Sequence, residues 1–125
     1  TLEEVLVRSN IIILSASYSE SNYQFLNKKY IDLLEDKYFV NTSRGELVDE
    51  VYLIEKIKQN FFRGIAIDTI QNEQAGNNLS NLLKCADKKN VIITPHIAGA
   101  TYNSMSNSEE FIVKKLKKCL NESNV

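Results

Sequence analysis

A chain of 125 residues with 43% hydrophobic and 25% charged residues is long and apolar enough for one folded domain, and this composition argues against disorder. The formal net charge of −1 argues against nucleic acid as the main partner, because binding to phosphates needs a basic field. There is no run of about 18 apolar residues and no signal peptide, so we expect no membrane partner and a cytoplasmic location. Cys85 and Cys119 lack metal-ligand spacing, and we expect both to be reduced thiols without a metal.

The first half of the chain is predicted to contain two helices and two strands. Thr1 and Glu4 have the spacing of a capping box, which would start a helix over residues 2–8. Residues 11–16 form a continuous apolar run rich in β-branched side chains, which is typical of a strand buried on both faces in a parallel sheet. The run is followed by a polar stretch, a helix at 27–35 and a second buried strand at 37–41.

The second half continues this alternation. Asp49 is expected to cap a helix over about residues 50–59, and a strand follows at 65–68. A polar loop then leads to a short helix at 79–85 and a strand at 91–94, which Pro95 ends. Ser106 and Glu109 predict a last helix over residues 107–120. Strands that alternate with helices predict an α/β fold around a parallel sheet.

Three candidate functional residues each follow a predicted strand: Arg44, Glu73 and His96. Ligands of parallel sheets bind at the carboxyl ends of the strands, so these side chains should share one edge. An arginine binds a carboxylate through two hydrogen bonds, and a histidine moves a proton near neutral pH. Each residue alone is more often structural or solvated, but the three together suit an anionic carbonyl substrate.

In these segments the sequence resembles the D-isomer-specific 2-hydroxyacid dehydrogenases. Residues 41–45, Asn-Thr-Ser-Arg-Gly, are similar to the Asn-Thr-Ala-Arg-Gly element of that family. Residues 64–68 are similar to its Gly-Ala-Ala-Leu-Asp strand, and residues 94–101 match its Thr-Pro-His-Ile-Ala-Gly-Ala-Thr element. Glu73 follows Asp68 at the spacing of the family's catalytic glutamate. The resemblance implies an oxidoreductase that uses NAD, with NADP left open, and acts on a small 2-hydroxy or 2-oxo acid.

The resemblance also implies a role for each matched residue. Arg44 would bind the substrate's carboxylate and carbonyl, His96 would give or take the proton at the substrate oxygen, and Glu73 would pair with His96. Asp68 would accept a hydrogen bond from the nicotinamide carboxamide. The cofactor pocket would be lined by Thr42, Ser43, Arg44, Asp68, His96, Ala98 and Gly99.

The sequence departs from the family in three places. Residues 15–17, Ser-Ala-Ser, replace a proline-containing turn, and Gln74 replaces the proline after the glutamate. None of the four glycines forms a Gly-x-Gly-x-x-Gly loop, so the pyrophosphate site is absent from these residues. We therefore expect the second half of a Rossmann-like doubly wound parallel sheet, lacking the first two strands. Residues 1–125 would be the nicotinamide side of a dinucleotide-binding domain within a longer two-domain protein.

Two functions fit this pattern. The chain supplies the catalytic half of an NAD-dependent dehydrogenase, or it is a non-catalytic binding or interaction module that kept half of the fold. A Gly-x-Gly-x-x-Gly loop encoded upstream would favour the first.

The order of the strands predicts how the chain assembles. If residues 11–16 are the third strand of a sheet with the order 3-2-1-4-5-6, absent strands would separate them from residues 37–41. This assignment predicts an unpaired strand and hence a homo-oligomer or an aggregation-prone chain.

Overall fold

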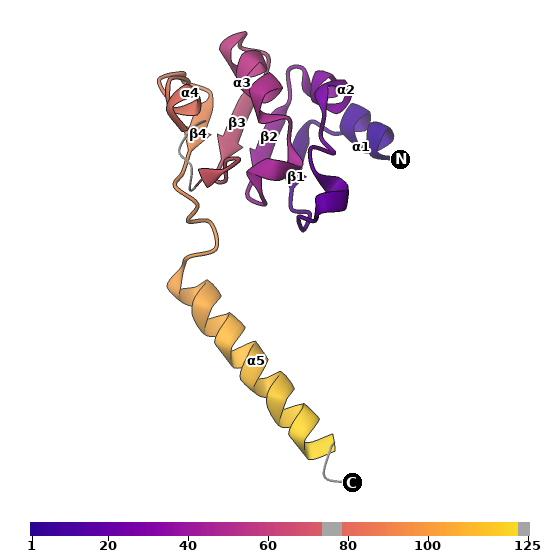
Figure 1. The fold of residues 1–125 in the computed structure, drawn as a ribbon, viewed down its shortest axis with the longest axis vertical. Coiled ribbons are helices and arrows are strands. Elements are labelled where there is room, and N and C mark those ends of the chain that lie inside the picture. The colour runs from indigo at the N-terminus through magenta and orange to yellow at the C-terminus, as the bar shows by residue number, and fades with distance from the viewer. Residues whose placement is uncertain (74–78, 123–125) are drawn as a thin grey trace.

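Four short parallel strands form one sheet in the computed structural model, which describes residues 1–73 and 79–122 (Figure 1). The order across the sheet follows the order in the chain, β1-β2-β3-β4, and each neighbouring pair is parallel. This arrangement confirms the predicted α/β class and half of a doubly wound sheet. The strands are β1 (Ile11–Leu14), β2 (Tyr38–Asn41), β3 (Gly64–Ile67) and β4 (Val91–Ile93).

The helices lie between the strands, as expected, with some changes at their ends. The helix predicted at 27–35 is split into a short α-helix and a 3₁₀ turn. The last helix begins at Tyr102 instead of 107, because Thr101 Oγ1 accepts a hydrogen bond from Ser104 N at 3.1 Å and takes the place expected for Ser106. The helices are α1 (Leu2–Arg8), α2 (Lys28–Ile31), α3 (Glu50–Lys58), α4 (Leu79–Leu83) and α5 (Tyr102–Glu122), and the 3₁₀ turns are η1 (Glu20–Asn22), η2 (Asp32–Leu34) and η3 (Gly45–Leu47).

The place of β1 in the sheet corrects the sequence-based prediction. β1 pairs directly with β2, with Ile11 opposite Tyr38 and Leu14 opposite Asn41, so the prediction that absent strands separate the two segments is wrong. Parallel strands joined by a helical crossover are usually neighbours, and residues 15–37 provide such a crossover through α2. β1 is therefore the first of a consecutive run of strands, and its other edge, like the outer edge of β4, has no strand partner among the described residues.

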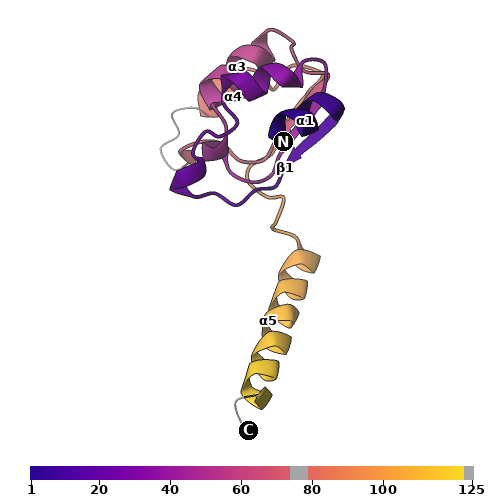
Figure 2. The ribbon, with the colours of Figure 1, turned by 90° about the vertical axis from the view of Figure 1, so that its right-hand side faces the viewer.

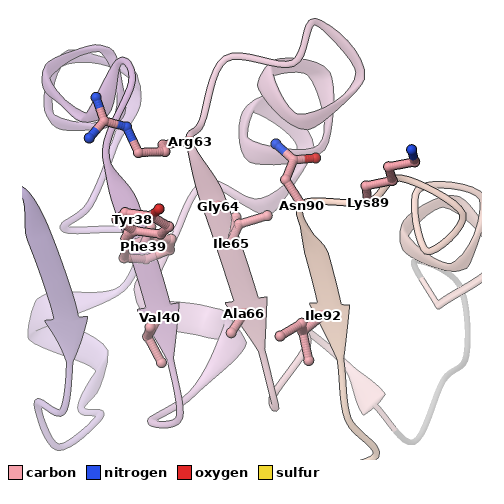
Figure 3. A pocket seen from close by; sticks show the side chains of 10 residues that line it. All are labelled: Tyr38, Phe39, Val40, Arg63, Gly64, Ile65, Ala66, Lys89, Asn90 and Ile92. Atoms are coloured by element: carbon pink, nitrogen blue, oxygen red, sulfur yellow. The ribbon is translucent and has the colours of Figure 1, made fainter.

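One face of the sheet is buried and the other is open. Phe39, Ile65 and Leu14 face the helices and form the core with buried residues of α1, α2, α3 and α4. On the opposite face Ile13 of β1 and Ile92 of β4 are 63% and 62% exposed. The apolar run of residues 11–16 predicts a strand buried on both faces, and this prediction is wrong for β1. Figure 3 shows this open face, where side chains of β2, β3 and β4 line a shallow apolar hollow of about 420 Å³.

The long helix α5 projects away from the sheet and its covering helices in both views (Figures 1 and 2). Residues 102–121 of this helix are all exposed. Met105, Ile112, Leu116 and Leu120 recur at helical spacing and form an apolar stripe without a partner among the described residues. None of the described helices is long and apolar enough to cross a bilayer.

Candidate active site

The candidate residues converge on the edge of the sheet at which the strands end. β2 leads into Arg44, β3 leads through Asp68 to Glu73, and β4 leads into His96. Among the candidate site residues, Asp68 is buried and Ser43 is half-buried. The others are exposed, so the site is open to solvent in this chain. The other candidates at this edge are Thr42, Ala98 and Gly99.

His96 and Glu73 form the contact that their spacing predicts. His96 Nδ1 lies 2.8 Å from Glu73 Oε2, and the side chains are 42% and 36% exposed. The second oxygen of Glu73 accepts a hydrogen bond from the backbone amide of Ile70 at 3.2 Å, which orients the carboxylate. Because Nδ1 is engaged by Glu73, Nε2 is the ring nitrogen available for proton exchange with a ligand.

The backbone at His96 has an uncommon conformation that the neighbouring strand holds in place. Its φ is 53°, in the left-handed region, which few residue types other than glycine adopt readily. Its amide donates to the carbonyl of Asp68 at 2.9 Å, and the amide of Thr94 donates to Ile67 at 3.0 Å. The direction of the imidazole is therefore set by the end of β3 as well as by β4.

Asp68 is the buried anchor of the loop that carries His96. It is only 5% exposed, and its carboxylate accepts hydrogen bonds from the amides of Ile97 and Ala98, both at 2.9 Å, and from the Thr94 hydroxyl at 2.5 Å. Burial alone would raise the pKa of this carboxyl. The hydrogen bonds from Thr94, Ala98 and Ile97, with a smaller contribution from the charge of His96, outweigh burial and hold the pKa below its ordinary value.

This lowered pKa predicts a loss of loop order in acid. The ionised carboxylate stabilises the fold above its unfolded pKa of about 3.9, and that contribution is lost as the pH falls through the lower folded value. We expect the amide proton resonances of Ile97 and Ala98 to shift together below about pH 4 as Asp68 is protonated. The Asp68→Asn variant should lack this transition. Amide shifts of Ile97 and Ala98 that titrate alike in both proteins would contradict the assignment.

Arg44 stands on a turn that the buried side chain of Asn41 organises. The Asn41 amide donates to Arg44 O at 3.2 Å, and its carbonyl oxygen accepts from Ser43 N at 3.0 Å. The Arg44 guanidinium donates to Ser43 O at 2.7 Å, and the Ser43 hydroxyl donates to the carbonyl of Ala16. The turn is thus bound to the segment that follows β1.

A polar hollow of about 440 Å³ lies between that segment and Arg44. Its walls are residues 15–18, Ser43 and Arg44. Residues 15–18 were not among the predicted site residues, because they lack the family's proline-containing turn. Their position directly after the first predicted strand of the parallel sheet was the signal that could have identified them.

The parallel sheet has the architecture of a doubly wound α/β domain, and the histidine–carboxylate pair lies at the carboxyl ends of its strands, where domains of this class bind ligands. Residues 1–98 match the family model described as D-isomer specific 2-hydroxyacid dehydrogenase, NAD binding domain. The chain belongs to this family.

Known relatives agree with this assignment. An aromatic 2-oxoacid reductase of Clostridium sporogenes is 32% identical over 94% of this chain and 38% of its own length. A glyoxylate reductase of Thermococcus gammatolerans is 28% identical over 92% of this chain and 33% of its own length. Among solved structures, D-lactate dehydrogenase from Aquifex aeolicus, complexed with NAD and lactic acid, superposes with a TM-score of 0.80 at 30% identity. That match covers 98% of this chain and 40% of the Aquifex chain, so this chain spans about a third to two fifths of the length of these three proteins.

Proposed function

We propose that this chain supplies the Arg44, Glu73 and His96 half of an active site that interconverts a 2-hydroxy acid and a 2-oxo acid. The observation that carries the proposal is the 2.8 Å contact between His96 and Glu73 at the edge where Arg44 also lies. When bound, the nicotinamide cofactor accepts or supplies the hydride. The structure of the Aquifex D-lactate dehydrogenase in complex with NAD and lactic acid supports this substrate class.

The residues of the chain divide the remaining chemistry. The Arg44 guanidinium would bind the substrate carboxylate through paired hydrogen bonds and leave the carbonyl near the histidine. His96 would give a proton from Nε2 to the oxygen during reduction and take it back during oxidation. Glu73 on Nδ1 fixes the tautomer and the direction of the ring.

The residues present fit the nicotinamide end of the cofactor. Thr42, Ala98 and Gly99 are exposed beside His96 and Arg44, and a Cβ added to Gly99 would meet no atom within 4 Å, so the space beside the loop is open. Asp68 already holds three hydrogen bonds from the loop, and its contact with the carboxamide is a further proposal. A structure at 26% identity, an acyclic imino acid reductase, contains NADPH, which supports NADP as the second candidate cofactor.

We also propose that polypeptide outside these 125 residues completes the active site. The sequence contains no Gly-x-Gly-x-x-Gly loop, and the relatives extend well beyond the matched region. The free edge of β1, the open sheet face and the stripe on α5 are apolar surfaces where further domains or a second copy would pack. Homo-oligomerisation and a cytoplasmic location are predictions, and sedimentation of the purified protein tests the first.

The experiment that tests the function uses a chimera. We expect the 125-residue chain alone to show no micromolar affinity for NAD by calorimetry, because it lacks the pyrophosphate loop. When it replaces the aligned segment of the Aquifex enzyme, the chimera should oxidise NADH in the presence of a 2-oxo acid. In the same chimera with Arg44→Ala, the rate of NADH oxidation should no longer saturate as the concentration of the 2-oxo acid rises. Micromolar NAD binding by the chain alone would contradict the first expectation.

The alternative, a non-catalytic interaction module, has one observation in its favour. The α5 stripe and the open sheet face are apolar and uncovered among the described residues, as a docking surface would be. A chimera that folds and binds NADH but does not reduce any 2-oxo acid would favour this alternative.

A further inference from the structure

The turn that carries Glu73 is held by a different carboxylate at each of three consecutive backbone amides. This is an unusual concentration of charge-assisted hydrogen bonds on one short loop, and such bonds are roughly twice as strong as neutral ones. The three bonds run from Ile70 N to Glu73 Oε1 (3.2 Å), from Gln71 N to Glu50 Oε2 (2.5 Å) and from Asn72 N to Glu46 Oε1 (3.2 Å).

The bond made by Glu50 is the buried one of the three. Glu50 is 4% exposed and Gln71 is 6% exposed, whereas the bonds of Glu46 and Glu73 are open to solvent. Burying a carboxylate is costly unless it is hydrogen-bonded, and a bond away from water is stronger than an exposed one. Glu50 is also the first residue of α3, where the helix dipole favours a negative charge.

The same turn is in direct backbone contact with the segment that carries Arg44. A Cβ added to Gly45 would lie 2.1 Å from Gln71 N and 2.1 Å from Ile70 C, so the two backbones touch at this point. Gln71 is fixed on its other side, because its side-chain amide donates to the Tyr23 hydroxyl at 2.7 Å. The position of Glu73 is therefore set by the Gly45 contact and by the buried bond of Glu50.

We propose that Glu50 is a positioning residue for the active site: its buried carboxylate holds the 70–73 turn against the Arg44–Gly45 segment and so sets where Glu73 meets His96. The inference rests on the proposed function of Arg44, Glu73 and His96, and it adds a residue whose described side-chain hydrogen bond goes to the Gln71 amide. Glu50 acts through Gln71 and the turn.

Nuclear magnetic resonance of the 125-residue chain tests this proposal, because His96 is its only histidine and its ring nitrogens give single, assignable signals. In Glu50→Gln and Glu50→Asp we expect the Nδ1 resonance of His96 to move toward its position in Glu73→Gln. The amide of Gln71 should exchange with solvent about tenfold faster or more. Glu55→Gln is the matched control, because Glu55 lies exposed on the same helix and bonds only to Gln59 among the contacts described for it. It should leave both signals unchanged.

A folded Glu50→Gln or Glu50→Asp protein with wild-type His96 resonances and wild-type Gln71 exchange would overturn the proposal. If neither variant folds, Glu50 supports the whole fold instead of the turn, and the proposal also fails. Neither signal depends on turnover. An inactive chimera whose His96 signal still responds to Glu50 would therefore refute the proposed function and leave the positioning role intact.

Discussion

Replacing His96 by asparagine or alanine is expected to lower kcat/KM for reduction of a 2-oxo acid by about 10²–10⁴-fold in the active chimera, the usual scale of general acid–base catalysis. The physical reason is that Nε2 is the proposed proton donor and no other histidine is present in the chain. Steady-state oxidation of NADH, followed by its absorbance, measures the effect. The dissociation constant of NADH, measured separately, shows how much of the loss comes from cofactor binding, because His96 also lines the proposed cofactor pocket.

The choice of two substitutions separates chemistry from backbone strain. Asparagine tolerates the left-handed backbone that His96 adopts at φ 53°, whereas alanine does so less readily. If the rate loss comes from the missing imidazole, the two variants should be similarly slow. A loss of less than about tenfold in His96→Asn would remove His96 from the role of proton donor.

The predicted elements were mostly right because their signals are local. The Thr1–Glu4 capping box is formed by both of its hydrogen bonds, and α1 ends at Arg8 as expected. The apolar runs of β1 and β2 became neighbouring strands. The start of the last helix was predicted too late, at the cap Ser106, because only the folded backbone shows that the Thr101 hydroxyl accepts the hydrogen bond from the Ser104 amide.

The order of the strands could not be read from the same signals. An apolar run shows that a strand is suited to a parallel sheet, but it does not show which strand lies beside it. Residues 11–16 were placed two strands too far from β2 for this reason. The exposure of Ile11 and Ile13 could not be predicted for the same reason. The apolar pattern of a strand is the same whether or not a second layer of helices covers the sheet.

In the site, the spacing of the family motifs predicted the contact between Glu73 and His96, but it did not predict the hydrogen bonds that hold their loops in place. The contact of Glu73 with His96 followed from the resemblance, and the structure contains it. The three bonds of the Asp68 carboxylate and the bond of Glu50 to Gln71 join segments at least 21 residues apart, and no local motif announces them. Supporting contacts of this kind depend on the packed fold.

Gly45→Ala, which adds one methyl group, is expected to lower the free energy of unfolding by about 3 kcal/mol. The added Cβ would overlap backbone atoms of Gln71 and Ile70 at 2.1 Å, and backbone has no flexible end that can turn aside. Relief requires the 70–73 turn to move away from the Arg44 segment, against the buried bond of Glu50.

Gly99→Ala is the matched control for this substitution, because it adds the same methyl group where a Cβ would meet no atom within 4 Å. Its unfolding free energy should stay within about 0.5 kcal/mol of the wild-type value. Urea unfolding followed by circular dichroism measures both variants. If the turn is displaced as the geometry requires, folded Gly45→Ala molecules should also show a shifted His96 ring signal, because Glu73 moves with the turn. Equal stability of the Gly45→Ala and Gly99→Ala proteins would show that the two backbones are not in contact at Gly45.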